Sequence, residues 1–498
     1  MALKLYQESD IQNIANSIRS KSGSQSTYTV SQMSTAIDNI PSGSSIPSYP
    51  LNNGKNNFWV FIQSSEEKIR VGCSAANITV DFGDGTTGVT TDNSGEYYVD
   101  HYYTDIGYYC IKADNCYGVK SIIGTETTSA EIKQLELNDY VDLTTQTAFD
   151  YIVGTEGNER RLLTKIKLNS LSFTDDIGSI FTYQSYLQTA NLSNTSITQI
   201  GRSTSNMYGF AQCHYLTNVL LPDTLGIIGN NVFNNCNKLT SIDLKNVTTI
   251  GSYAFNDCNS LSNIDLKNIT TIGGYGFSGC TSLSSVDLSS VTSIGRFGFN
   301  GCTALTGSIS STNITSIDYG AFKNTAITSV NVPNATIANN GSGAFKDCTS
   351  LTTAIVGVLN GSTSGNAFEN CTALTTATIN GGTNIPRSSF KNCTSLTTVN
   401  LPNTITTING TAFSGCTSLT TLTIPASVTT ISQQAFSDCT SMQEYHFLST
   451  TPPTLENTNT FNNIPANCII YVPASAVEDY KVATYWSDYA SYIQAEPS

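Results

Sequence analysis

The sequence predicts a multidomain, mainly β protein in which a solenoid of 22- to 23-residue coils follows a small β-sandwich and a short α-helical N-terminal module. Three observations lead to this prediction: phenylalanine and cysteine recur at a fixed spacing after residue 205, apolar and polar residues alternate within 58–126, and two short amphipathic stretches lie within 1–43. The predicted domains are 1–43 (helical module), 44–57 (linker), 58–126 (sandwich), 127–204 (irregular first coils), 205–466 (repeats) and 467–498 (closing cap).

Composition and charge exclude several classes of protein. Charged residues make up 12% of the 498, and acidic residues exceed basic ones by 37 to 23, for a net charge of −14. A nucleic-acid binder needs clustered Lys and Arg, so this class is disfavoured. The first 40 residues have no apolar core of the kind found in a secretory signal, and no apolar run reaches membrane-spanning length. We therefore expect a soluble chain that starts at Met1, without membrane insertion.

Residues 1–43 contain two stretches with helical periodicity, and Ser31 is a candidate N-cap of the second. The apolar positions are Ile11, Ile14, Ala15 and Ile18 in the first, and Met33, Ile37 and Ile40 in the second. This segment resembles an N-terminal module of tail, baseplate and fibre proteins of bacteriophages that infect Gram-positive and gut bacteria. The resemblance implies attachment to other virion proteins through 1–43. Residues 44–57 follow as a linker rich in Pro, Gly, Ser and Asn.

Residues 58–126 alternate apolar and polar side chains in short runs separated by glycine-rich turns, which predicts a small β-sandwich. The segment resembles the polycystic-kidney-disease (PKD) type of immunoglobulin-like domain. The matching positions are Asp81, Phe82, Gly83, Asp84, Gly85, Thr86, His101, Tyr102, Tyr103, Gly107 and Tyr109. We expect the Gly-Asp-Gly turn to serve backbone geometry rather than calcium binding. Cys73, Cys110 and Cys116 could include one disulfide, whose pairing the sequence does not give.

The repeat is marked by two residue types. The cysteines from Cys213 to Cys439 are separated by 22 or 23 residues, with one double gap of 46 between Cys302 and Cys348, where Thr325 stands at the midpoint. Phenylalanine keeps the period without a gap, at Phe210, Phe233, Phe255, Phe277, Phe299, Phe322, Phe345, Phe368, Phe390, Phe413 and Phe436. This period lies in the range of leucine-rich repeats, whose coils bury apolar side chains against their neighbours.

One coil, 412–431, shows which side chains should face inward. By the L-x-x-L-x-L spacing and strand alternation, the inward positions are Phe413, Cys416, Leu419, Leu422, Ile424, Val428 and Ile431. Stacked strands lie about 4.8 Å apart, but in-register side chains do not have the directions that a disulfide requires. We therefore expect the repeat cysteines to be structural free thiols rather than disulfides or redox groups.

From about residue 205 to the end, the pattern is similar to the BspA-like leucine-rich repeats. In that family a strand and helix close the array, and 467–493 looks like this ending. Segments near 163 and 187 keep the leucine spacing without the Phe-x-x-Cys signature, so we expect them to form irregular opening coils.

The outward positions of the coils are the candidate ligand surface. They are Asp243, Asp265 and Asp287, with Lys245 and Lys267 beside them, and later Thr378, Asn400 and Thr423. The aspartate row could take a divalent cation or an amine-bearing sugar, or it could be a solvated face whose charge the lysines offset. The threonine-rich rows suit hydrogen bonding to a glycan or protein, and equally suit β-propensity and solubility.

No catalytic motif is present, so we expect no enzyme. The sequence has no GxSxG, Walker loop or HExxH. Its three histidines, His101, His214 and His446, lie in three different contexts and are expected to be packed or surface residues. The 14 cysteines include no C-x-x-C pair, so neither a zinc site nor a cofactor is expected.

These resemblances imply a bacteriophage virion structural protein, of tail-fibre, baseplate or head-fibre type, that presents the repeat surface for noncovalent adhesion to a host receptor or glycan. It would lie on the particle surface, and homotrimers are common among such proteins. One alternative is a BspA-like adhesin on the bacterial cell surface or outside the cell. Another is a purely structural virion decoration protein.

Overall fold

The computed structural model describes residues 56–62, 68–73, 75–93, 96–103, 107–113, 116–123, 126–129, 132–137, 165–168, 181–201, 209–338, 341–361 and 365–497. The chain divides into two compact units, Met1–Leu163 and Thr164–Ser498, which are considered separately. The predicted helical module at 1–43 and nearly all of the linker at 44–57 lie outside the described residues, so both stay predictions.

The described part of the first unit consists of two antiparallel groups of strands. One has the order β10 (Ile132–Leu137), β1 (Asn56–Ile62), β7 (Gly107–Ala113), β3 (Thr79–Asp81) and β4 (Thr87–Val89). The other has the order β5 (Thr91–Asn93), β6 (Glu96–Tyr102), β2 (Lys68–Cys73), β8 (Cys116–Ile123) and β9 (Glu126–Ser129). The expected boundary at residue 126 falls on β9, and β10 lies beyond it.

Side chains at the start of β2 alternate as expected of a half-buried strand. On β2, Ile69 and Val71 are fully buried, whereas Lys68 and Arg70 between them are partly exposed. The two groups of strands touch at Gly88 on β4, where an added Cβ would lie 2.8 Å from Val99 on β6. Cys73 is disulfide-bonded and lies opposite Cys116 in the register of β2 with β8.

The Asp-Phe-Gly-Asp-Gly-Thr stretch forms a turn whose carboxylates are engaged by their own backbone. Asp81 accepts a hydrogen bond from the Gly83 amide at 2.9 Å, and Asp84 accepts one from the Thr86 amide at 2.9 Å. The hydroxyl of Tyr103, the residue after β6, donates to the Phe82 carbonyl at 2.8 Å and ties the turn to the end of that strand. These bonds agree with the structural role expected of the turn, whereas membership of the PKD type stays a prediction.

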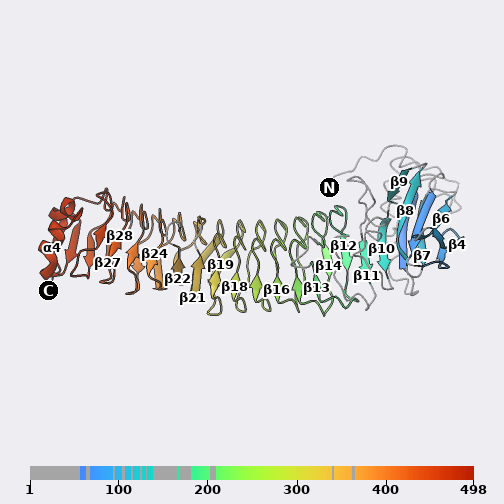
Figure 1. Ribbon diagram of the computed structural model, residues 1–498, viewed down its shortest axis with the longest axis horizontal. Coiled ribbons are helices and arrows are strands. Elements are labelled where there is room, and N and C mark those ends of the chain that lie inside the picture. Colours follow the sequence, from blue (N-terminus) through green and yellow to red (C-terminus); the bar gives the residue numbers. More distant parts are fainter. Residues whose placement is uncertain are drawn as a thin grey trace, which may run out of the picture. The chain divides into compact units, whose positions relative to one another are not determined.

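The second unit is a β-solenoid, as the sequence predicts, and its coils follow one another in a row in Figure 1. A coil can contribute two short strands, one to each of two rows of parallel strands. The first row consists of β11 (Lys165–Leu168), β12 (Thr189–Asn191), β14 (Asn218–Leu220), β19 (Thr306–Ser310), β21 (Ala326–Ala338), β22 (Thr353–Asn360), β23 (Thr376–Gly381), β25 (Thr398–Asn400), β27 (Thr421–Ile424), β29 (Glu444–Phe447) and β31 (Ile469–Val472).

The second row pairs in parallel through one isoleucine or leucine per coil. Its strands are β13 (Gln199–Ile200), β15 (Ile227–Ile228), β16 (Thr249–Ile250), β17 (Thr271–Ile272), β18 (Ser293–Ile294), β20 (Ser316–Ile317), β24 (Asn384–Ile385), β26 (Thr407–Ile408), β28 (Thr430–Ile431) and β30 (Thr454–Leu455). β21 pairs with β19 and with β20, so this long strand contributes to both rows.

The recurring phenylalanines form one buried column, the interior phenylalanine column. Consecutive ring centroids are 5.2 to 5.7 Å apart and the ring planes differ by 2 to 16°. These are offset-stacked contacts, which are favourable beyond the area that they bury. The column contains the eleven expected residues and continues to Phe181 at one end and Phe461 at the other.

The recurring cysteines form a second buried column of free thiols, which confirms the structural interpretation. Each of the ten thiols donates to the carbonyl of a phenylalanine in the preceding coil, at 3.0 to 3.3 Å. Thr325 instead donates to Phe322 of its own coil at 2.8 Å. Because burial disfavours the thiolate, it raises the pKa of Cys348 to about 11 and of Cys302 to about 12.

A left-handed turn precedes each column cysteine from Cys236 on, and also Thr325. The residues there have φ between 56 and 75° and are Asn235, Asp257, Gly279, Gly301, Asn324, Asp347, Asn370, Asn392, Gly415 and Asp438. Only Gly, Asn and Asp visit this conformation readily. The turn therefore explains why one of these three precedes every column cysteine except Cys213, where Gln212 has φ 64°.

The chain closes with β31, η1 (Ala474–Ala476), α4 (Val477–Val482), η2 (Trp486–Tyr492) and β32 (Ile493–Ala495). Trp486 is fully buried, and its indole N–H donates to the Pro453 carbonyl at 2.7 Å. Its ring lies edge-on to Phe447 at 5.1 Å. This aromatic cluster covers the last coil, which would otherwise expose its apolar columns to water.

Candidate functional site

The outward positions of the first strand row are the first candidate surface. In the register of β22, β23 and β25, Ile355 lies beside Thr378, and Thr378 beside Asn400, whose amide donates to the Thr378 hydroxyl at 3.0 Å. Farther along, Thr423 lies beside His446. The structure therefore brings Thr378 and Asn400 together as expected, next to the exposed Ile355.

Each of the three aspartates in the earlier coils stabilises a local backbone turn. The Asp243 carboxylate accepts from the Lys245 amide at 3.0 Å, Asp265 from the Lys267 amide at 3.0 Å, and Asp287 from the Ser289 amide at 2.9 Å. A carboxylate that caps the amide two residues on defines an Asx turn. Over the described part of the chain, no group of three or more His, Cys, Asp or Glu side chains could hold a metal ion.

The neighbouring lysines offset this acidic row in two different ways. Lys267 lies 2.9 Å from the Asp265 carboxylate, and this hydrogen bond lowers the pKa of Asp265. Lys245 instead reaches toward the preceding coil, where it lies 3.9 Å from Asp223. Both pairs are well exposed, so each contributes little to stability. The geometry agrees with a solvated, lysine-compensated face.

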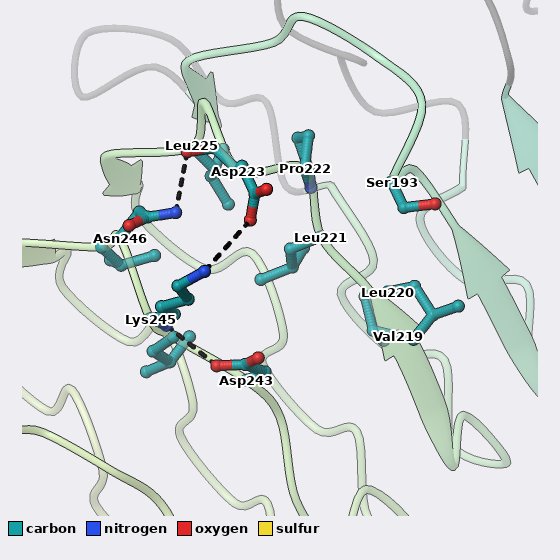
Figure 2. Close-up of a pocket in the computed structure, with 12 residues that line it drawn as sticks. Ser193, Val219, Leu220, Leu221, Pro222, Asp223, Leu225, Asp243, Lys245 and Asn246 are labelled. Atoms are coloured by element: carbon teal, nitrogen blue, oxygen red, sulfur yellow. Dashed lines mark hydrogen bonds and ion pairs between the residues drawn. The ribbon is translucent and has the colours of Figure 1, made fainter.

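A small hollow of about 140 Å³ lies beside Asp243 and Lys245. Figure 2 shows Lys245 and Asp223 pointing toward each other at its edge, with Val219 and Leu220 of β14 on another side. Leu220 is 46% exposed. Pockets for whole small molecules usually measure about 300–1,000 Å³. The hollow is therefore large enough for one side chain or part of a sugar, and it was not predicted from the sequence.

Each of the three histidines has side-chain partners that orient its ring. His101 lies 2.7 Å from Asp84 and stacks on Phe82. His214 lies 2.7 Å from the Asn237 amide oxygen. His446 lies 2.9 Å from the Glu496 carboxylate and stacks on Tyr471. The partners of all three are carboxylates, amides, carbonyls and rings, which agrees with their interpretation as packed or surface residues.

A second column of rings, which was not predicted from the sequence, lies at the surface of the array. We call it the surface aromatic column, and it consists of Tyr253, Tyr275, Phe297 and Tyr319. Tyr253 and Tyr275 stack at 4.5 Å, Tyr275 and Phe297 at 4.9 Å, and Tyr319 meets Phe297 edge-on at 5.4 Å. All four are half-buried. The available signal was an aromatic residue two positions before three successive column phenylalanines.

Comparison with protein families identifies the repeats. The model of the BspA type leucine rich repeat region (6 copies) matches residues 203–292, 281–383 and 361–476, which together are more than half of the chain. A search of curated proteins finds no match. In the described part of the chain, every helix is too short or too polar to cross a membrane.

Two solved structures illustrate the similarity. A leucine-rich repeat protein from Bacteroides ovatus is 23% identical with a TM-score of 0.52, and the match covers 76% of this chain and 98% of that one. A leucine rich cell surface protein from Faecalibacterium prausnitzii is 19% identical with a TM-score of 0.32, over 76% and 97% of the two chains. At 23% identity, the similarity to the Bacteroides ovatus protein extends to the fold alone.

Proposed function

The chain belongs to the BspA-type leucine-rich repeat family, and from this premise we propose that it is a noncovalent recognition protein. Its repeat array would present an outward face to a protein or glycan on another surface. Leucine-rich-repeat solenoids are as a rule binding proteins rather than enzymes, because stacked coils give an extended, rigid surface without a catalytic cleft.

One observation carries this proposal: the coils agree inside and differ outside. The buried column positions repeat the same residue types from coil to coil. The outward strand position, in contrast, changes from Asp243, Asp265 and Asp287 to Ile355, Thr378, Asn400 and Thr423. Stability requires only the inside to repeat. A varied exterior on an invariant frame supports recognition of a specific partner.

Two settings fit this role. BspA-like repeat proteins are cell-surface proteins, so family membership favours a place on a bacterial cell. The resemblance of residues 1–43 to a phage attachment module favours a tail fibre, baseplate or head fibre, in which the array contacts the bacterial host. A structural decoration protein without a receptor is the third candidate.

Deleting residues 1–43 separates the settings. Loss of the protein from purified phage particles, with the array still folded, would favour the virion setting. Detection of the full chain on bacteria that carry no phage would favour the cell-surface setting.

The recognition role is tested with the fluorescently labelled full-length chain on bacterial cells and on protein and glycan arrays. A variant with lysine at Thr378, Asn400 and Thr423 leaves every buried column residue in place. Saturable binding that this variant loses, with its thermal unfolding unchanged, would support the role and place the contact on that row. Absence of binding to every cell, protein and glycan at micromolar concentration would contradict the role and favour decoration.

A further inference from the structure

The surface aromatic column occupies backbone positions that suit aromatic residues poorly. Tyr253, Tyr275 and Phe297 have φ of 58, 58 and 54°, in the left-handed region that disfavours bulky side chains. The equivalent positions with positive φ in other coils hold smaller or polar residues: Asn231, Gly320, Asn366, Ser388, Thr411 and Gln434. Three successive coils thus carry a local strain that the fold does not require, and such strain gathers at functional sites.

An exposed arginine lies on this column. An added Cβ on Gly274 would lie 3.0 Å from Arg296 Cγ, so the Arg296 stem crosses the backbone of the preceding coil. The Arg296 guanidinium is 5.8 Å from the Tyr275 ring centroid, and its Nη1 donates to the Tyr319 hydroxyl at 3.4 Å. The column therefore holds the guanidinium at the surface against two phenols.

Arg296 has no carboxylate partner within the described part of the array. The chain has a net charge of −14. In the described part of the array, however, the groups that act on Arg296 are the hydroxyls of tyrosines, and no carboxylate forms an ion pair with it. A guanidinium presents a planar set of donors that matches a carboxylate in a bidentate arrangement. Charge complementarity therefore points to an anionic ligand group.

We propose that Arg296, with Tyr275 and Tyr319, binds a carboxylate side chain of a protein partner. This inference rests on the recognition role proposed above and specifies its ligand. A protein is favoured over an acidic glycan because sugars stack on free aromatic faces. Here Tyr275 has one face against Tyr253 and the other against Phe297. The column instead offers ring edges and hydroxyls beside an arginine, and Tyr and Arg are enriched at the centres of protein interfaces.

The chain provides a matched control. Arg387 is exposed and, like Arg296, lies three residues before a column phenylalanine. The residue after it is Ser388, whereas Phe297 follows Arg296. Arg387→Ala therefore removes the same charge from the same repeat position, but from a coil outside the surface aromatic column.

The test uses a display library of random heptapeptides on the full-length chain, followed by fluorescence anisotropy of the enriched peptides at physiological salt. Enriched peptides should contain Asp or Glu. They should bind R387A within about twofold of the original chain and R296A about tenfold more weakly. R296K keeps the charge without the planar donors, so its affinity for the peptides should lie between those of R296A and the original chain. Thermal unfolding of each variant checks that the array is intact.

In the peptide assay, three results would overturn the proposal: no enrichment of acidic peptides, equal losses in R296A and R387A, or Arg296-dependent binding of oligogalacturonate with none of the peptides. Cell binding separates this proposal from the recognition role. If R296A binds cells or arrayed proteins as tightly as the original chain, only the Arg296 site is wrong. If the original chain binds nothing, the recognition role is wrong as well.

Discussion

Phe345→Ala would remove one ring from the middle of the interior phenylalanine column. The Phe345 ring is fully buried, lies 5.5 Å from Phe322 and 5.3 Å from Phe368, and is within 5° of parallel to both. Truncating a buried Phe to Ala costs about 3–5 kcal/mol, because transfer free energy is lost and a cavity remains. The rings on both sides are held by their own stacks, so the cavity cannot readily collapse.

The loss should be local, because each coil contacts only its neighbours. Hydrogen exchange followed by mass spectrometry measures the opening free energy coil by coil. A loss of about 3 kcal/mol in the coils around Phe345 speeds exchange there by roughly 150-fold, while coils at the far ends of the array change little.

Phe345→Leu is the control. It keeps most of the apolar volume and should cost about 1–2 kcal/mol. If Phe345→Ala changed exchange in the flanking coils by less than about threefold, the ring column could not be a main source of stability, and the stacking argument would be refuted.

Three further predictions concern the turns and the thiols. Asp265→Ala should lower the urea midpoint of unfolding, because the Lys267 amide loses its acceptor, whereas Asp265→Asn, which keeps an acceptor oxygen, should leave the midpoint nearly unchanged. If the triple variant D243N/D265N/D287N lost target binding, the aspartate row would be a ligand site after all. Gly301, at φ 71° and with the nearest atom 4.0 Å from an added Cβ, should tolerate Asn, the residue found there in other coils, whereas Gly301→Val should cost about 1–2 kcal/mol by urea unfolding. Equal costs would contradict the left-handed requirement. Burial raises the pKa of the column thiols above the ordinary value near 9, so the folded state keeps protons that the unfolded state releases. Stability is therefore complete below pH 9 and falls between about pH 9 and 12, by about 1.4 kcal/mol per pH unit for each thiol. Circular dichroism should show cooperative alkaline unfolding in this window, and a fold unchanged at pH 11 would oppose it.

The interior of the array could be predicted from the sequence because burial requires the same residue type at the same place in every coil. Phe413, Cys416, Leu419 and Ile431 were expected inside, and all are fully buried. The buried positions can be read from the repeat spacing alone, because every interior coil packs between two coils of the same kind.

The ends of the array were harder to predict. One early coil contains Phe181, Gln184 and Leu187 at the column positions. Gln184 stands where later coils have cysteine, and its side chain is only 1% exposed. A polar residue in an apolar column hides the repeat from a search for cysteine. Phe461 extends the column at the other end, where the spacing from Phe436 has grown to 25 residues.

The outward surface could be predicted only as a set of positions. The Asp-x-Lys pattern places Asp265 at the surface, but the hydrogen bond that its carboxylate accepts from the Lys267 amide depends on the local turn. The surface aromatic column depends on contacts between successive coils at a left-handed position, and no propensity suggests an aromatic residue there. Outward residues are free to vary, so their pattern contains little of the periodicity that makes the interior readable.

The central claim, that dry columns with reduced thiols run through the array, is tested most directly by thiol titration without reductant. The eleven buried free cysteines, from Cys213 to Cys468, should not react with Ellman's reagent in native buffer at neutral pH, and all should react in concentrated urea. Fewer than eleven reactive thiols in urea, or rapid reaction of several in the native protein, would contradict the account.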